Sequence, residues 1–151
     1  MLQTTRLRDD GGPGLSPDAL VNAFWEALNS FLPPQGALVL ARADAGHLIA
    51  CGALSNIGDG IGELKYLYVR PEARNTGLGR ALVQSRIDIA REMGLSCIFA
   101  DTLKASVEMH GLYEDMGFER VNSLPKSKTL RDFAELTPFM FFYKLHLGPT
   151  A

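Results

Sequence analysis

A glycine-containing loop joins a strand-like segment to a helix-like segment near the middle of the chain. The segment ELKYLYV, residues 63–69, resembles a strand, and GRALVQSRIDIAREMG, residues 79–94, resembles a helix that Gly94 closes. Leu78, Leu82, Ile89 and Met93 are expected on one face of this helix. Gly77 ends the loop between the strand and the helix, and Gly79 lies in the first turn of the helix. Such a connection directs backbone N–H groups and the positive end of a helix dipole at one point. The sequence therefore predicts a phosphate-binding loop.

Two common nucleotide-binding loops fit this segment poorly. The P-loop requires Gly-Lys-Ser or Gly-Lys-Thr, which the sequence does not contain. A Rossmann loop is supported by the G-x-G of Gly77 and Gly79 and by Asp101 at the end of the next strand. Against it, Leu82 occupies the place of the third glycine, and the stretch after Val69 is longer than a Rossmann turn. We discard the P-loop and keep the Rossmann loop and a plain tight turn as alternatives.

The segment RNTGLG, residues 74–79, resembles the R/Q-x-x-G-x-G/A signature of the GNAT acyltransferases. The longer stretch 63–82 is similar to the family's strand, loop and helix, and LYEDMGFERV is similar to its LY…GF block about thirty residues later. Element order is similar from about Gly36 to Leu147, whereas the first 35 residues match loosely. The resemblance implies one α/β domain over residues 1–151, with a mixed central β-sheet, flanking helices and splayed central parallel strands.

The resemblance also implies acetyl-CoA as co-substrate, without a metal. Its pyrophosphate is expected on the loop backbone, and its pantetheine arm beside the strand edge at residues 67–69, where it can complete the strand's hydrogen bonds. The residues expected to bind it are Leu67, Tyr68, Val69, Arg74, Asn75, Thr76, Gly77, Leu78, Gly79, Arg80 and Ser106. Asn75 stands where the family often has Gly, and Asn tolerates a left-handed backbone. Ser106 stands where many members have Asn.

Tyr113 lies in the LY…GF block, where the resemblance implies a tyrosine that protonates the departing CoA thiolate. A thiolate leaving group benefits from such a donor in a water-poor site. The alternative is a core aromatic residue, because Tyr113 shares helical spacing with Met109, Leu112 and Met116. The sequence leaves both roles open.

Glu63 opens the strand before the loop, six residues ahead of Val69. The histone-acetylating branch of the family carries a glutamate at this spacing that takes a proton from the acceptor amine, and the resemblance implies that role here. Amines are mostly protonated at pH 7, so a base must act before the lone pair can attack. A structural carboxylate at the strand end is the alternative.

Short strands and helices are predicted along the rest of the chain. Thr4–Arg8 is expected as a first strand, followed by the loop DDGGPG. Ser16 as N-cap and Pro17 at the first helical position predict a helix that ends at Pro33-Pro34. The segments ALVLARA and HLIACGAL are expected to form a hairpin around Gly46. Further strands are predicted at SCIFADT, FERV and FMFFYKLHL, and a helix at SVEMHGLYEDMGF, with PKSKTLRDFAELTP as a polar connection.

The composition narrows the function classes. With 151 residues, 46% hydrophobic content and a net charge of −2, the chain has the size of one domain and lacks the basic run expected for nucleic-acid binding. No apolar stretch approaches the roughly 20 residues of a membrane span, and the N-terminus lacks an apolar signal core. Cys51 and Cys97 lie in apolar runs and are expected to be buried free thiols of a reducing compartment. We therefore expect a cytoplasmic protein without nucleic-acid or membrane partners.

These observations predict an N-acetyltransferase that moves an acetyl group from acetyl-CoA directly to a primary amine of a small molecule or peptide, with a homodimer left open. A non-catalytic acyl-CoA-binding sensor or partner-binding module would use the same loop and is the alternative. In the family fold, the stretches NAFWEALNSFLPP and NSLPKSKTLRDFAELTP are expected to form the acceptor pocket, and neither carries a signature for a particular acceptor.

Overall fold

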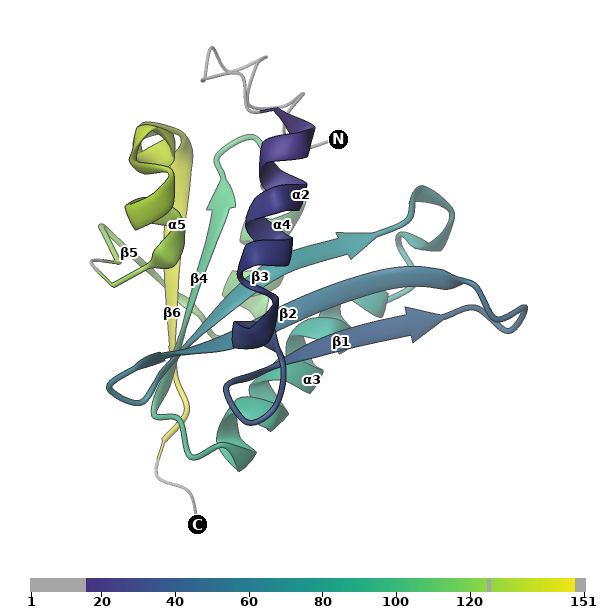
Figure 1. Ribbon diagram of the computed structural model, residues 1–151, viewed down its shortest axis with the longest axis horizontal. Coiled ribbons are helices and arrows are strands. Elements are labelled where there is room, and N and C mark those ends of the chain that lie inside the picture. The colour runs from purple at the N-terminus through teal and green to yellow at the C-terminus, as the bar shows by residue number, and fades with distance from the viewer. Residues whose placement is uncertain (1–15, 125, 149–151) are drawn as a thin grey trace. The chain divides into compact units, whose positions relative to one another are not determined.

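The computed structural model describes residues 16–124 and 126–148 (Figure 1). The chain divides into two compact units, each made of two separate segments. The first unit comprises the described parts of Met1–Leu28 and Phe99–Leu145, and the second comprises Asn29–Ile98 and the described part of His146–Ala151. The strand predicted at Thr4–Arg8, with its loop, lies outside the described residues.

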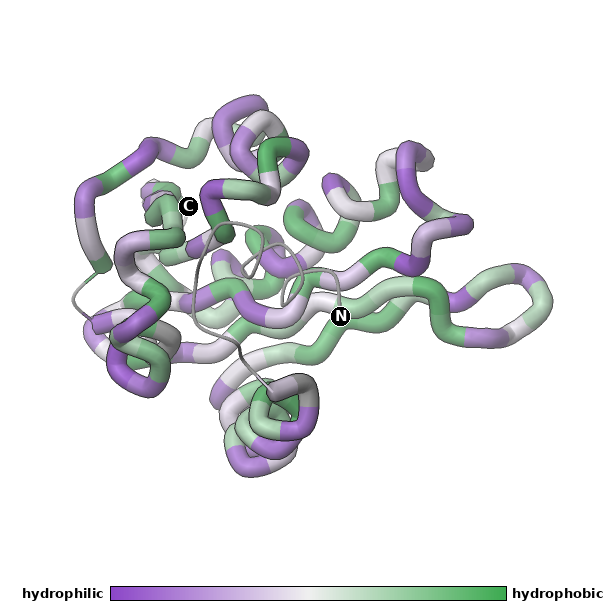
Figure 2. Tube along the Cα trace, turned by 90° about the horizontal axis from the view of Figure 1, so that it is seen from above, coloured by the Kyte–Doolittle hydropathy of each residue, from purple (hydrophilic) through white to green (hydrophobic). Residues whose placement is uncertain are grey.

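Three antiparallel strands form the sheet of the second unit: β1 (Gly36–Arg42), β2 (Leu48–Gly58) and β3 (Ile61–Val69). β1 and β2 form the predicted hairpin, in which the Ala43 N–H donates to the His47 carbonyl oxygen over 2.9 Å. Gly46 in its turn has a φ of 96°, which glycine adopts at low cost because it lacks a Cβ atom. Figure 2 shows hydrophobic residues along both strands and a mixture of hydrophilic and weakly hydrophobic residues in the turn.

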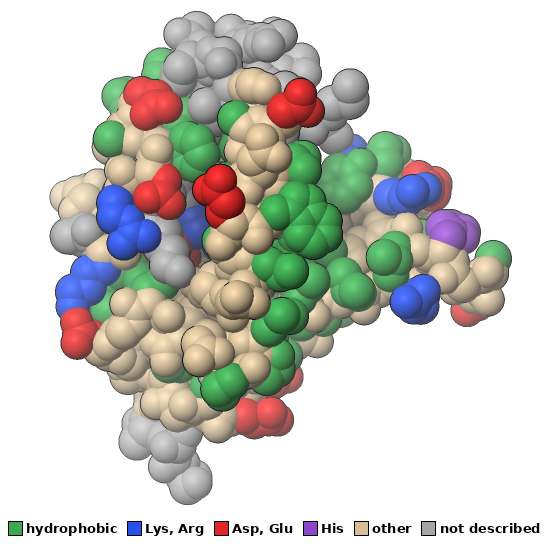
Figure 3. Space-filling model, in the orientation of Figure 1, with side chains coloured by type: hydrophobic (Ala, Val, Ile, Leu, Met, Phe, Trp, Pro, Cys, Tyr) green, Lys and Arg blue, Asp and Glu red, His purple; other side chains and the backbone are tan. Residues whose placement is uncertain are grey.

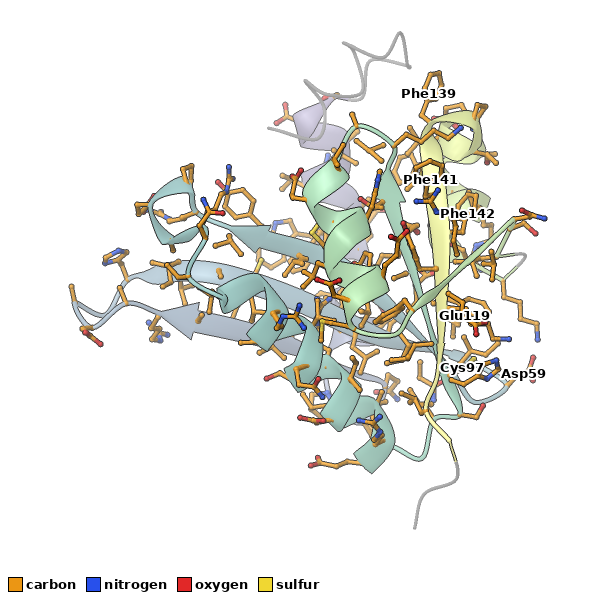
Figure 4. All side chains as sticks on the ribbon, turned by 180° about the vertical axis from the view of Figure 1, so that it is seen from behind. Asp59, Cys97, Glu119, Phe139, Phe141 and Phe142 are labelled. Carbon is orange, nitrogen blue, oxygen red and sulfur yellow. The ribbon has the colours of Figure 1, made fainter. Side chains whose placement is uncertain are left out.

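A two-residue turn, Asp59 and Gly60, joins β2 to β3. Both residues have a positive φ, 55° and 74°, as the favoured Asp-Gly hairpin turn requires. The Gly60 carbonyl oxygen accepts hydrogen bonds from the N–H groups of Ser96 at 2.7 Å and Cys97 at 3.3 Å. These bonds tie the turn to the chain that follows the next helix, and Figure 4 labels Asp59 and Cys97 there.

Helix α3 (Leu78–Glu92) packs against β1, β2 and β3 on one face of their sheet (Figures 1 and 4). Gly77 is its N-cap residue and Gly94 follows its C-terminus, with φ values of 83° and 76°. The two glycines therefore bound the helix as the sequence predicts. Its buried residues are Leu82, Val83, Arg86, Ile87 and Ala90.

The apolar face predicted for this helix is partly wrong. Ile89 and Met93, which were expected on the core face, are only half-buried, and the buried stripe passes through Arg86 instead. A buried arginine escapes a search for apolar periodicity, because that search assigns every charged residue to the solvent side. The stripe is therefore rotated from its predicted position.

The first unit combines helix α2 (Pro17–Glu26) with strands β4 (Cys97–Leu103), β6 (Met140–His146) and β5 (Glu119–Val121), in the strand order β4-β6-β5. Helix α4 (Val107–Asp115) connects β4 to β5, and Gly117 after it has a φ of 90°, the left-handed conformation that is common just after a helix C-terminus. β5 and β6 are antiparallel, with Arg120 opposite Tyr143. The strands and helices of the two units confirm the predicted α/β fold class.

Two segments differ from the sequence prediction. The first α-helix ends at Glu26, and the 3-10 helix η1 (Leu28–Phe31) replaces its expected last turn. Asn29 and Ser30 explain the change, because their side chains compete for backbone hydrogen bonds and favour helix ends. Helix α5 (Lys128–Asp132) and the 3-10 helix η3 (Ala134–Phe139) lie in the stretch predicted as a polar connection. Elements this short show no measurable periodicity in sequence.

Cys51 and Cys97 are both thiols outside any disulfide, but only Cys97 is buried as predicted. Cys51 is half-buried, because it lies on the sheet face opposite α3, beside the exposed residues Leu40 and Tyr68. None of the described helices has the length and hydropathy needed to cross a membrane. Within the same residues, no group of three or more His, Cys, Asp or Glu is placed to hold a metal ion.

Candidate active site

The loop between β3 and α3 begins with the short 3-10 helix η2 (Pro71–Ala73) and contains two residues with a left-handed backbone. Asn75 has a φ of 60° and Gly77 a φ of 83°. Asn adopts this conformation more readily than most residues, and glycine adopts it without steric cost. Asn75 thus has the left-handed backbone that asparagine was expected to tolerate at this position.

Two side chains fix this loop from within. Arg74 Nε donates to the Val69 carbonyl oxygen over 2.9 Å, and the guanidinium carbon lies 5.9 Å from the centre of the Tyr68 ring. Thr76 Oγ1 donates to the Ala73 carbonyl oxygen over 2.6 Å. The loop is therefore anchored to the end of β3, which leaves its tip at residues 75–77 exposed.

Backbone donors of α3 point toward the exposed tip. Helical bonding begins with the Ala81 N–H, which donates to the Gly77 carbonyl oxygen over 3.0 Å. The N–H groups of Leu78 and Gly79 precede it and are directed at the tip, together with the positive end of the helix dipole. A Cβ atom built on Gly77 would meet no other atom within 4 Å, so the space around it is open. This arrangement can bind an anion such as a phosphate group.

A β-bulge interrupts β3 just before the loop. The pairing of β2 with β3 shifts register there, so that Tyr66 and Leu67 lie opposite the single residue Gly52. Tyr66 has a φ of 54°, a left-handed conformation that costs roughly 1–2 kcal/mol in a residue other than glycine. A bulge turns peptide groups out of the regular ladder and can present them to a ligand. The predicted cofactor contact Leu67 thus lies in a strained part of the strand.

Glu63 is fully buried, and its carboxylate forms an ion pair with the Lys65 ammonium group at 3.1 Å. Both side chains lie on the sheet face opposite α3, because alternate residues share a face and a Cβ on Gly62 would point toward Leu95 at the end of that helix. Ser55 pairs with Glu63 across the strands, and its buried hydroxyl has no hydrogen-bond partner in the described structure. The carboxylate can accept a proton here or hold Lys65 in place.

Exposed apolar side chains lie along these strands at the bulge and beyond it. Leu40, Leu48, Tyr66 and Tyr68 are all exposed. Figure 3 views the face of these strands opposite α3 and shows hydrophobic side chains on it, interspersed with charged and other side chains. Such a surface can pack against the apolar part of a ligand that reaches the bulge.

Tyr113 lies on α4 in the first unit, within an aromatic cluster. Its side chain is only 4% exposed, and its ring centre lies 5.0 Å from that of Phe118 and 5.3 Å from that of Tyr143. Tyr143 belongs to β6, whose neighbouring residues Phe141 and Phe142 are labelled in Figure 4. The cluster holds the Tyr113 ring in one orientation, which suits a core residue and equally a fixed hydroxyl donor. Ser106, buried at the N-cap of α4, lies in the same unit.

Most of the predicted site residues come together in the second unit. It contains Glu63, the strand end at residues 67–69 and the loop at residues 74–80. Tyr113 and Ser106 belong to the first unit, so their place in the same site stays a prediction.

Sequence reasoning missed the residues in and around the bulge, which are Cys51, Gly52, Lys65, Tyr66 and Arg86. Two signals in the sequence were available. Arg86 follows Leu82 by four residues and Val83 by three, which places a cation on the core face of α3. Lys65 likewise follows Glu63 by two residues and shares its face of the strand.

Cys51 contacts the bulge from β2. Its Sγ donates to the Tyr66 carbonyl oxygen over 3.4 Å. Burial raises the pKa of the Cys51 thiol above its ordinary value of 9.0, while a backbone hydrogen bond with Tyr68 and the charge of Arg86 act in the opposite direction with smaller effect. The thiol is therefore protonated at neutral pH and available as a donor.

Residues 3–118 match the sequence model of the acetyltransferase (GNAT) family. The chain belongs to this GNAT family. The resemblance carried by the loop and by the LY…GF block is thereby confirmed.

Two relatives illustrate how far the similarity extends. The chain is 36% identical over 93 residues to an uncharacterised N-acetyltransferase of Schizosaccharomyces pombe, covering 61% of this chain and 57% of the relative. It is 33% identical over 92 residues to an IAA acetyltransferase of Azospirillum brasilense, covering 60% of each protein. The chain thus spans about three fifths of the length of these curated relatives.

Solved GNAT structures share the fold. A GNAT acetyltransferase of Staphylococcus aureus superposes with a TM-score of 0.70 at 21% identity, covering 88% of this chain and 81% of that protein. A GNAT acetyltransferase of Elizabethkingia anophelis with acetyl-CoA bound gives a TM-score of 0.65 at 20% identity, covering 87% and 83%. These likenesses confirm the predicted GNAT-type fold with a mixed sheet and flanking helices.

Proposed function

We propose that this GNAT protein is an N-acetyltransferase that moves an acetyl group from acetyl-CoA directly to a primary amine of a small molecule or peptide. One observation carries the proposal: in the second unit, the bulge at residues 66–67 leads into the loop at residues 74–80, which has a left-handed backbone at Asn75 and Gly77. The loop offers backbone donors for a pyrophosphate, and the bulge offers them for an acyl carbonyl. Acetyltransferase names among the relatives support the same activity.

Acetyl-CoA would lie along the path from the loop to the bulge. Its pyrophosphate would bind the backbone of residues 75–80, next to the Arg74 and Arg80 side chains, and its pantetheine amides would pair with the strand end at residues 67–69. The acetyl-CoA bound to the Elizabethkingia anophelis protein supports this choice of co-substrate. No metal is required for the proposed reaction.

The proposed reaction forms one C–N bond and breaks one C–S bond. The acceptor amine attacks the thioester carbon, and N–H groups of the bulge near Leu67 stabilise the negative charge on the carbonyl oxygen. Glu63 accepts the proton of the amine, directly or through a water molecule. Tyr113 gives its proton to the CoA sulfur as the thiolate leaves.

A non-catalytic acyl-CoA-binding module is the alternative. It would need the anion-binding loop and the strand end, but it would not need a buried acid next to the acyl position. Glu63 is buried and forms an ion pair with Lys65, on the strand that leads to the bulge. A buried acid at this place favours the enzyme over the binding module.

The acceptor is proposed here only as a primary amine. A relative from Pseudomonas aeruginosa is named L-methionine sulfoximine/L-methionine sulfone acetyltransferase and is 33% identical over 85 residues, covering 56% of this chain and 47% of that protein. Amino acids and their analogues therefore belong in any acceptor screen. Five expectations from the sequence stay predictions. They are a single domain over residues 1–151, splayed central strands, a cytoplasmic location, a homodimer, and the absence of nucleic-acid and membrane partners.

Acetyl-CoA is expected to raise the melting temperature of the protein. A ligand specific for the native state, at about 100 times its dissociation constant, adds roughly 2.7 kcal/mol of stability. For a domain of this size, that gain shifts the melting temperature by several degrees. Differential scanning fluorimetry with acetyl-CoA, NADH and ATP provides the measurement. A shift with NADH or ATP and none with acetyl-CoA would overturn the proposed co-substrate and favour the Rossmann alternative.

Glu63→Gln is expected to lower turnover most at low pH and progressively less toward pH 10. A free amine needs no base, so the variant should approach wild type as the pH approaches the pKa of the acceptor amine. The measurement is kcat/KM for the acceptor between about pH 6 and pH 10. Parallel profiles for variant and wild type would remove Glu63 from the mechanism.

A double variant separates chemistry from stability. Glu63→Gln alone leaves the nearly buried Lys65 ammonium without its carboxylate, which costs about 3–5 kcal/mol when a buried pair is broken. Glu63→Gln with Lys65→Met removes both charges and should recover much of that loss. A catalytic Glu63 predicts that thermal stability returns in the double variant while turnover at low pH does not.

A further inference from the structure

Arg86 is a buried guanidinium on α3 that contacts both strands at the bulge. It is fully buried, and its Nε donates to the Leu82 carbonyl oxygen of the same helix over 3.0 Å. Its Nη1 donates to the Ala53 carbonyl oxygen of β2 over 3.0 Å and to the Lys65 carbonyl oxygen of β3 over 3.3 Å. Ala53 and Lys65 are paired with each other immediately before the register shift. One side chain therefore bridges the two strands where the bulge begins.

Gly52 makes room for this guanidinium. A Cβ atom built on Gly52 would lie 2.8 Å from the Arg86 Cζ atom and 2.9 Å from its Nε atom, closer than real contacts allow. Gly52 is also the single residue of β2 that faces the two bulge residues of β3. The guanidinium thus occupies the space of a missing side chain on the α3 side of the bulge.

The contacts of Arg86 act on the peptide groups that form the bulge. The Lys65 carbonyl and the Tyr66 N–H belong to one trans peptide group, in which they point in opposite directions. A cation that binds the carbonyl oxygen fixes this group and strengthens its N–H as a donor. The next peptide group is held in the same way, because the Cys51 thiol donates to the Tyr66 carbonyl oxygen and the N–H of that group belongs to Leu67.

A merely space-filling role explains Arg86 poorly. Burial of a guanidinium is unfavourable unless hydrogen bonds compensate for the lost water. The neighbouring positions of the buried stripe are the apolar residues Leu82, Val83 and Ala90. Besides the Leu82 carbonyl oxygen of its own helix, Arg86 binds the carbonyl oxygens of Ala53 and Lys65, the residue pair that begins the bulge.

We infer that Arg86 is a positioning residue for acyl transfer, which holds the bulge of β3 so that the N–H groups of Tyr66 and Leu67 face the carbonyl oxygen of the bound thioester. The inference rests on the proposed function, in which the bulge binds that oxygen. Arg86 itself lies behind the strand and acts through its peptide groups. It sets the direction of the donors, on which stabilisation of a developing oxyanion depends steeply.

Two ligands that differ only at the carbonyl test this role without knowledge of the acceptor. Acetyl-CoA carries the thioester carbonyl, whereas S-ethyl-CoA is a thioether of nearly the same shape without it. Calorimetry on the full chain gives both dissociation constants, and infrared difference spectra of acetyl-CoA labelled at the carbonyl carbon report polarisation of that bond. Wild type is expected to prefer acetyl-CoA and to lower its carbonyl stretching frequency relative to water.

The variants are Arg86→Met, Arg86→Lys and Gly52→Ala, with Arg91→Met as the matched control on the exposed side of α3. In Arg86→Met, the preference for acetyl-CoA over S-ethyl-CoA, measured as the ratio of their dissociation constants, is expected to fall about tenfold. Most of the shift in carbonyl stretching frequency should disappear, while the affinity for S-ethyl-CoA stays nearly unchanged. Gly52→Ala should reproduce this result with Arg86 still present, because the new methyl group displaces the guanidinium. Arg86→Lys should restore part of both signals, and Arg91→Met should match wild type.

Either of two results would overturn the inference about Arg86 and leave the proposed function standing. One is a folded Arg86→Met or Gly52→Ala protein with wild-type preference and wild-type carbonyl frequency. The other is a wild-type protein that binds both ligands equally with no carbonyl shift. If wild type binds neither ligand, the proposed function itself fails. If Arg86→Met does not fold, Gly52→Ala and Arg86→Lys decide by the same two signals.

Discussion

Gly77→Asp is expected to reduce acetyl-CoA affinity by at least about 100-fold while the protein stays folded. The new carboxylate would lie at the N-terminus of α3, where the proposed pyrophosphate binds, and juxtaposed like charges cost several kcal/mol. No atom lies within 4 Å of a Cβ at this position, so the side chain fits without a clash. Its backbone φ of 83° adds strain, but Asp tolerates a left-handed conformation better than most residues. Calorimetry and thermal melting measure the two effects separately.

Two control variants separate charge from backbone strain. Gly77→Asn has nearly the same shape and backbone tolerance without the charge, and it should keep affinity within about tenfold of wild type. Gly46→Asp places the same charge at a turn with a φ of 96° and equally open surroundings, in the hairpin between β1 and β2. It should bind acetyl-CoA like wild type. A Gly77→Asp protein that does the same would place the phosphate site elsewhere.

Tyr113→Phe is expected to lower turnover by about 100-fold, the usual size of a general-acid contribution, with acetyl-CoA affinity nearly unchanged. The ring would keep its contacts with Phe118 and Tyr143, because only the hydroxyl is removed. Steady-state kinetics and calorimetry on the same preparation measure turnover and affinity. Wild-type turnover in this variant, with chemistry limiting the rate, would return Tyr113 to a packing role.

Tyr143→Phe is the matched control for that experiment. Tyr143 belongs to the same aromatic cluster, and its hydroxyl accepts a hydrogen bond from Arg120 at 3.2 Å and donates to Glu114 at 3.4 Å. Loss of that hydroxyl should lower stability by about 1 kcal/mol and leave turnover unchanged. Equal losses of turnover in the two variants would point to a general disturbance of the cluster.

The elements bounded by glycine, proline or a long apolar pattern could be predicted from the sequence. Gly77 and Gly94 bound α3, and Gly46 marks the first hairpin turn, because each needs a backbone conformation that other residues adopt at a cost. The loop at residues 74–79 could also be assigned to the GNAT signature, since its residues are contiguous. In these cases, residues that are neighbours in the sequence were sufficient to predict the structure.

The bulge and its surroundings could not be predicted, because they depend on pairing between distant segments. Tyr66 gives no local sign of a positive φ, since tyrosine rarely adopts one. The register shift that produces it arises between β2 and β3, and Arg86 reaches it across the face of the sheet. The ion pair between Glu63 and Lys65 was visible as a spacing of two residues, but its burial depends on the rest of the fold.

Acetyl transfer from acetyl-CoA to an amine, the central claim, is tested most directly by acceptor-dependent release of free CoA thiol. Amino acids including methionine sulfoximine, polyamines, aminoglycosides and peptide N-termini form the acceptor panel, and mass spectrometry identifies the acetylated product. We predict thiol release in equal amount to an N-acetylated product for one class of acceptor, and its loss in Gly77→Asp. Tight acetyl-CoA binding without acceptor-dependent thiol release across the panel would contradict the claim and favour the non-catalytic binding module.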